Sequence, residues 1–169
     1  DGLPAIGTHT LGSDGSDVTS FSGLGINRVP VASSGTADAN VNDITITATT
    51  GGSQQAIVPA GGSVTQQAIF FTGSNHDAVA KFLMLNVNKI SGGGSPRVTI
   101  KGVVYNRQFA TDYEVFRYTM DTAVENSFVL DEPVGFNLSP TDVLYFSADS
   151  NTANTVVNVR FSLVEYQRS

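Results

Sequence analysis

The sequence predicts an all-β protein, an antiparallel jelly-roll-like β-sandwich of eight or nine strands with an extended N-terminal arm. From residue 43 onward, short alternating or apolar segments recur between Gly, Pro, Asn and Asp turn signals spaced roughly 8–15 residues apart. Two longer crossing connections favour a jelly roll over an immunoglobulin topology. The chain contains no cysteine and no tryptophan, so the Cys…Trp…Cys pattern of immunoglobulin domains is missing.

Residues 1–42 are predicted to form the arm, and residues 43–169 the β-sandwich domain. The arm is rich in Gly, Ser, Thr, Ala and Asp, a composition that buries too little apolar surface to fold alone. Its apolar residues fit neither helical nor strand period, and Gly23, Gly25 and Pro30 oppose a helix. We expect the arm to lie in a groove of its own domain or of a neighbouring subunit. The candidate assembly contacts are Phe21, Leu24, Ile26 and Val29.

The strand pattern begins with a β-branched run at 44–49, which ends at the glycines of residues 51–52. Residues 54–58 and 66–70 share the phrase Gln-Gln-Ala-Ile and are separated by a Pro/Gly turn, which predicts two further short strands. Residues 77–90 are ambiguous, because a cap at Asn75 or Asp77 would suit a short helix. The alternation that follows favours a strand, as the apolar residues are Leu83, Leu85 and Val87.

The remaining strands are expected at 98–105, 113–119, 127–130, 142–147 and 155–166. The first of these is predicted to form a long hairpin with 77–90, and the last two an antiparallel pair joined by the loop 149–154. A short helix at 106–112 would not change the fold class. Residues 133–140 have proline at both ends and are expected to connect strands across the top of the fold. Phe161 is assigned to the core face, so Phe161→Ala is expected to cost about 3–5 kcal/mol.

Composition and charge exclude several functions. The net charge is −6, and nucleic-acid binding needs clustered Lys and Arg instead. Six of the fifteen acidic residues but one of the nine basic residues lie in residues 1–80, so the front of the chain is its acidic part. No apolar run approaches the roughly 20 residues of a membrane helix, so no membrane insertion is expected. Without cysteine there is no thiolate metal site, and two histidines do not form a histidine-rich site.

Candidate chemistry is sparse, and no catalytic residue, metal ligand or cofactor is expected. The closest carboxylate pairs are Asp131 with Glu132 and Asp112 with Glu114, which read most simply as solvated side chains. Two short oxygen-rich turns, 14–17 and 149–151, lack the spacing of a calcium-binding loop. His76 is expected to be an exposed loop residue. The five tyrosines could form a platform for sugars, although core packing is the simpler interpretation.

The chain as a whole resembles structural proteins of tailed bacteriophages. The resemblance rests on an acidic chain without Cys or Trp, the arm at 1–40, the Pro/Gly turn at 58–63 and the closing strand at 156–166. The chain is similar to jelly-roll capsid decoration (cement) proteins and to the β-sandwich heads of phage tail fibres. The resemblance implies a non-enzymatic virion protein, a homo-oligomer and commonly a trimer, on the outer surface of the particle. Its partners would be capsid or tail proteins, and for a fibre head or adhesin a receptor or surface glycan of the host.

Overall fold

The computed structural model describes residues 10, 25–29, 31, 40, 42–52, 54–61, 68–89, 91–130 and 135–168. The chain divides between residues 67 and 68 into two compact units, which are described separately. This division falls after the first two strands, whereas the sequence analysis divides the chain at residue 42. Most of the predicted arm lies outside the described residues, so its extended form stays a prediction.

The first unit contains an antiparallel hairpin made of β1 (Ile44–Thr47) and β2 (Gln54–Val58), in which Ile44 is paired with Val58. The strands predicted at 44–49 and 54–58 are therefore present, and they pair with each other. Val58 is fully buried. The Asn40 side chain lies beside it and donates hydrogen bonds to the carbonyl oxygens of Val58 (3.3 Å) and Pro59 (2.8 Å). This contact fixes the chain ahead of β1 against the end of β2.

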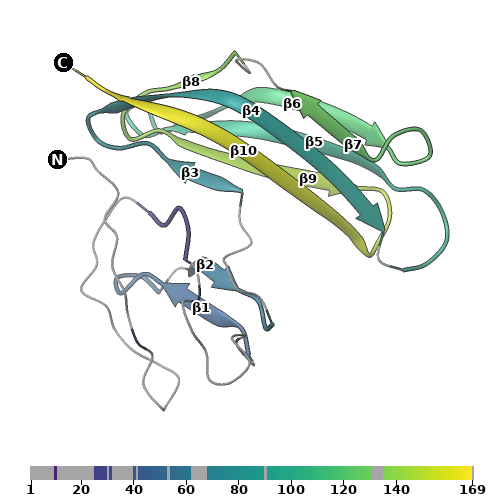
Figure 1. The fold of residues 1–169 in the computed structure, drawn as a ribbon. Coiled ribbons are helices and arrows are strands. Elements are labelled where there is room, and N and C mark those ends of the chain that lie inside the picture. Colours follow the sequence, from purple (N-terminus) through teal and green to yellow (C-terminus); the bar gives the residue numbers. More distant parts are fainter. Residues whose placement is uncertain are drawn as a thin grey trace. The chain divides into compact units, whose positions relative to one another are not determined.

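The second unit consists of two antiparallel sheets (Figure 1). One has the order β10-β4-β7, with β8 also paired to β4, and the other has the order β3-β9-β5-β6. The part of the chain that the structure describes contains no helix, which confirms the all-β antiparallel class. The strands are β3 (Ile69–Phe71), β4 (His76–Lys89), β5 (Arg97–Asn106), β6 (Thr111–Asp121), β7 (Ser127–Leu130), β8 (Asn137–Leu138), β9 (Val143–Ser150) and β10 (Thr155–Gln167).

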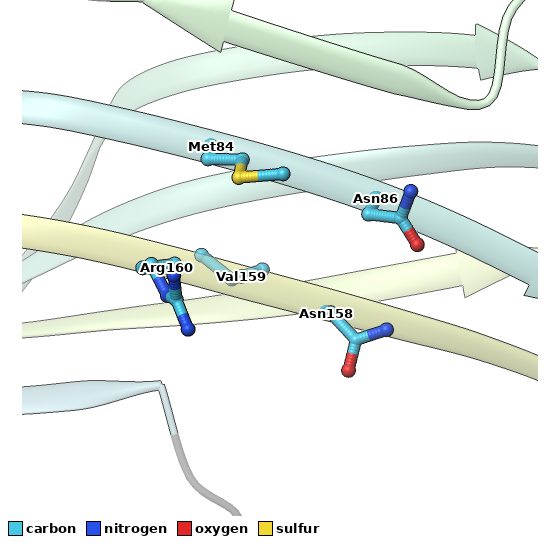
Figure 2. Close-up of a pocket in the computed structure, with 5 residues that line it drawn as sticks. All are labelled: Met84, Asn86, Asn158, Val159 and Arg160. Carbon is cyan, nitrogen blue, oxygen red and sulfur yellow. The ribbon is translucent and has the colours of Figure 1, made fainter.

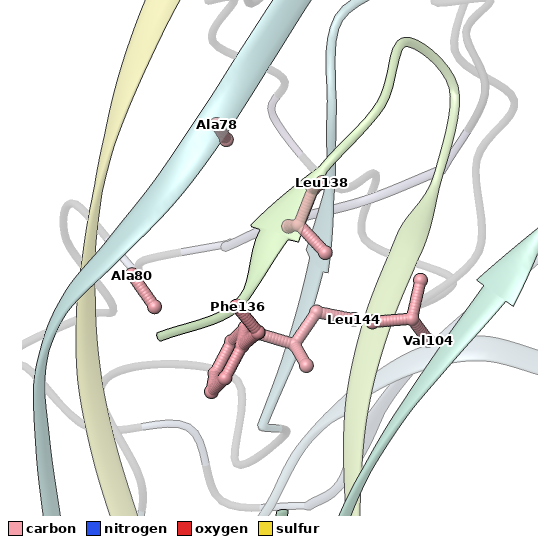
Figure 3. Packing of buried hydrophobic residues seen from close by; sticks show 6 residues of the cluster. All are labelled: Ala78, Ala80, Val104, Phe136, Leu138 and Leu144. Carbon is pink, nitrogen blue, oxygen red and sulfur yellow. The ribbon is translucent and has the colours of Figure 1, made fainter. Parts of the chain in front are cut away.

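The two sheets share a core, an arrangement consistent with a β-sandwich. Side chains at every second position point inward, so β4 contributes Leu83, Leu85 and Val87 to the core, all essentially inaccessible to solvent. They pack with residues of β5 and β6 from the other sheet. A second cluster closes the other end of the sandwich (Figure 3) and consists of Ala78, Ala80, Val104, Phe136, Leu138 and Leu144.

Strand pairing differs from the sequence-based prediction at three points. Of the ambiguous segment, residues 77–89 form part of strand β4 rather than a helix, but β4 pairs with β7, β8 and β10, and β5 pairs with β6 and β9. The predicted hairpin of β4 with β5 is therefore wrong, and so is the predicted pair of β9 with β10. In both cases the connecting loop crosses from one sheet to the other, and alternation within a strand does not encode which strand lies beside it. The expected connection at 133–140 contains the short strand β8.

Glycine is required at one position inside a strand. Gly102 lies in β5 at a register shift of the β5–β6 pair. A Cβ atom there would lie 3.0 Å from the Phe146 ring and 3.2 Å from the Phe116 Cβ. The two aromatic residues of the neighbouring strands can approach the β5 backbone closely because this side chain is absent.

Candidate functional site

A hollow of about 430 Å³ lies on the face of β4 and β10 that points away from the core (Figure 2). The strand register sets Asn158 opposite Asn86 and Arg160 opposite Met84, so a pair of amides lies beside a guanidinium group and a methionine. Val159, the fifth lining residue, belongs to the inward row of β10. Sequence analysis did not single out these residues, because outward polar positions on a strand look like ordinary solvated positions.

The hollow offers amide and guanidinium groups. The Asn86 Nδ2 group donates to the Asn126 carbonyl oxygen (3.2 Å), and the Asn86 Oδ1 atom accepts from the Asn88 amide. Arg160 makes no ion pair with any residue that the structure describes. A guanidinium group beside amides can donate hydrogen bonds to hydroxyl or carboxylate oxygens. The described lining contains no acid, histidine or hydroxyl that could act as a nucleophile or a general base.

A buried carboxylate holds the loop before β9. Asp142 is 1% exposed. Its Oδ1 atom accepts a hydrogen bond from the Asn106 amide (2.9 Å), and its Oδ2 atom accepts one from the Ser139 N–H (2.8 Å). Burial raises the pKa of Asp142, and these two hydrogen bonds partly oppose that rise. Because the Asp142 carbonyl oxygen also accepts from the Thr72 N–H (3.0 Å), the residue joins the ends of β3, β5 and β9.

His76 is not the exposed loop residue that the sequence predicts. It is the first residue of β4, is 7% exposed, and belongs to the inward row that continues with Ala78 and Ala80. The prediction is wrong because the polar residues at 73–75 end one position before the strand begins. The Nδ1 atom of His76 and the Oγ1 atom of Thr72 are buried and have no hydrogen-bond partner among the described residues. No second titratable side chain bonds to the imidazole, so this position carries no acid–base pair within the described residues.

The candidate carboxylates are engaged in local pairs where the structure describes them. Glu114 forms a double hydrogen bond with Arg117 (2.6 and 2.8 Å), which lowers the pKa of Glu114. Asp112 accepts a hydrogen bond from the Tyr145 hydroxyl (3.3 Å), and Asp149 pairs with Lys101 (3.0 Å). Residues 14–17 and 131–132 lie outside the described ranges. Within those ranges, no three His, Asp or Glu side chains come together as a metal site would require.

Tyr113, Tyr118 and Tyr166 do not gather into one surface. Tyr118 stacks on Phe128 with ring centroids 4.1 Å apart, and its hydroxyl donates to Glu125 (2.6 Å). Tyr113 and Tyr166 are exposed, but they lie on strands of different sheets, β6 and β10. Of the candidate assembly contacts, Ile26 and Val29 are half-buried, whereas Phe21 and Leu24 lie outside the described residues. The candidate assembly contact therefore stays a prediction.

Comparison with protein-family models, with curated proteins and with solved structures found no match for this chain. No helix among the described residues is long and apolar enough to cross a membrane.

Proposed function

We propose that this protein is a non-enzymatic structural protein of a virion, an outer capsid decoration protein that stabilises the particle. It acts through contacts with its own copies, as a trimer, and with the capsid. The resemblance in composition and chain organisation supports this proposal, and so does the local engagement of the described carboxylates. The single observation that carries it is the pairing pattern of the second unit, which we interpret as an incomplete jelly roll.

A jelly roll nests four antiparallel pairs: the first strand with the eighth, second with seventh, third with sixth, and fourth with fifth. Here β3 pairs with β9, β4 with β7 and β8, and β5 with β6. If β7 and β8 count as two pieces of one strand, these are the inner three pairs. The pairs β4–β10 and β5–β9 then link these nested pairs into two sheets, as in a jelly roll. The outermost pair is missing among the described residues, since β10 pairs there with β4 alone.

An outer pair that is open among the described residues suits a protein that works by assembly, because a neighbouring chain can supply a strand there. The test uses the full chain and the particle from which it comes. Light scattering is expected to give three copies or a multiple of three, and electron microscopy is expected to show the protein on the outside of the capsid. A variant with Phe21, Leu24, Ile26 and Val29 replaced by serine is expected to lose capsid binding. Val124→Ser, at an exposed turn position, is the matched control. Full oligomerisation and full capsid binding by the fourfold variant would contradict the proposal.

The hollow on β4 and β10 favours a second candidate function, that of a receptor- or glycan-binding head of a tail fibre or adhesin. Its amides and the Arg160 guanidinium are suited to sugar hydroxyl and carboxylate groups. A glycan array probed with the wild type and with Asn158→Ala tests this function. A glycan bound by the wild type and lost in the variant would support it. No bound glycan, together with no adsorption to host cells, would exclude it.

A further inference from the structure

Strand β10 has one edge that no described strand pairs with. It pairs with β4 along its whole length, from Thr155↔Lys89 to Gln167↔His76. Within the described part of the chain nothing pairs with its other side, and Figure 1 shows β10, in yellow, at the border of its sheet. Alternate residues of an antiparallel strand direct their N–H and C=O groups away from a given neighbour. About half of the backbone groups of β10 are therefore available to another strand.

The other described sheet edges are short or charged, as edges that avoid association are. The edge strands β3, β7 and β8 have three, four and two residues. The edge strand β6 has 11 residues, and four of them are charged: Asp112, Glu114, Arg117 and Asp121. Strand β10 has 13 residues and contains neither Gly nor Pro. Its charged residues are Arg160 and Glu165 alone, so this long edge lacks the usual protection.

The core is also incompletely covered along this edge. The inward side chains of β10 pack on both core clusters but remain half-buried; they are Val157, Val159, Phe161 and Leu163. Their register partners on β4 include Leu83, Leu85 and Val87, which are shielded completely. A strand added beside β10 with apolar residues on the same side would cover the exposed part of this row.

We propose that β10 of a second copy of this chain pairs with β10, antiparallel and across a two-fold axis at Phe161. A two-fold axis pairs residues that lie at equal distances on either side of it. Phe161 is the middle residue of Thr155–Gln167, so this axis gives full overlap of the two strands. The two sheets become one continuous sheet, and each copy covers the half-buried row of the other.

Side-chain chemistry selects this axis among its neighbours. With the axis at Phe161, Arg160 lies opposite Ser162 of the second copy, and Val159 lies opposite Leu163, so apolar residues meet on the core side. An axis at Arg160 would set two guanidinium groups against each other, which is unfavourable. An axis at Ser162 would set Val159 against Glu165. A shift that pairs odd with even positions would place apolar residues opposite polar ones on each face.

This contact goes beyond the proposed function, because it predicts a dimer, or a hexamer where it is combined with a three-fold contact. The chain has no cysteine, so introduced thiols report on it directly. Residues directly opposite each other in an antiparallel pair have Cβ atoms about 4.5–5.5 Å apart, close to the range that a disulfide spans. Under mild oxidation, a mixture of full-length Arg160→Cys and Ser162→Cys is expected to form a covalent dimer.

Three controls make this result specific. Each cysteine variant alone is expected to give little covalent dimer, because identical positions on either side of the axis are diagonal rather than opposite. Val129→Cys, on the opposite edge of the same sheet, is expected to give none with either variant. Circular dichroism of each variant verifies that it is folded, which all three exposed positions should permit.

Charge gives a second, independent measurement. Ser162→Lys would place a lysine opposite Arg160 of the other copy, and the two-fold axis would create this pair of like charges twice. The variant is expected to weaken self-association by about twofold to thirtyfold. Adding Arg160→Glu to this variant is expected to restore the association, because each lysine then faces a carboxylate. Val129→Lys is the matched control and should leave the association unchanged. A cross-linked mixture together with charge rescue would support the contact. A monomer, or a trimer that does not cross-link, would overturn the β10–β10 contact. This outcome does not depend on whether the protein binds the capsid.

Discussion

Leu83 and Phe161 lie opposite each other on β4 and β10, and their truncation provides a test of where the sheet ends. Leu83 is completely buried between its neighbours on β10 and β7. Phe161 packs on both core clusters and on the Phe146 ring, with ring centroids 5.3 Å apart, but it is half-buried because β10 is an edge strand. We expect Leu83→Ala to destabilise the protein more than Phe161→Ala, although phenylalanine loses more atoms.

The two costs follow from burial. Leu83→Ala opens a cavity walled on every side, and for such sites about 3–4 kcal/mol is typical. Phe161→Ala leaves a space that is open toward the free edge, so the cavity contribution is small. Full burial of a phenylalanine side chain stabilises a protein by about 1.5–3 kcal/mol. Because Phe161 is only half-buried, its truncation is expected to cost about 1–2 kcal/mol. This value replaces the 3–5 kcal/mol expected from the sequence.

Urea unfolding followed by tyrosine fluorescence measures the difference. Tryptophan is absent, and all five tyrosines lie between residues 105 and 166, so the signal reports on the second unit alone. With a slope of about 2 kcal/mol per M, the midpoint should fall by about 1.5–2 M for Leu83→Ala and by about 0.5–1 M for Phe161→Ala. Unfolding should be measured at a protein concentration low enough for the protein to be monomeric. An equal or larger loss for Phe161→Ala in dilute protein would show that β10 is not an edge, and would refute the reasoning.

Three further substitutions test other parts of the fold. Because burial raises the pKa of Asp142, its contribution to stability is greatest in acid and falls as pH rises through that pKa. Asp142→Asn should therefore cost more free energy of unfolding at pH 4 than at pH 7. Gly102→Ala should cost about 1–3 kcal/mol because its Cβ would press on two aromatic residues, whereas Gly93→Ala, with open space around it, should be near neutral in the same urea titration. Arg168→Ala should raise the pKa of Asp77, which its hydrogen bonds now lower, and a carboxyl NMR titration that shows no rise would contradict this pairing.

Alternation predicts the strands well where one face is covered by the core. The segments 98–105, 113–119 and 155–166 all lie within observed strands, because a half-buried strand leaves a period of two in its own sequence. His76 was misplaced since its row of inward residues begins directly after a polar turn. The hollow on β4 and β10 leaves no comparable pattern, because Asn and Arg at outward positions are common on any solvated strand.

The sequence by itself determined most of the strands and, where apolar and polar residues alternate, which side of a strand faces the core, since both depend on neighbours along the chain. Only the tertiary structure decided which strands lie side by side. Strand β4 could have paired with β5 across a simple turn, and β9 with β10, but each connection crosses between sheets instead. Many strands of this chain present similar apolar rows, so partner choice depends on how all the rows close one core together. For the same reason only the fold shows that β10, an ordinary alternating strand in the sequence, is the last strand of its sheet among the described residues.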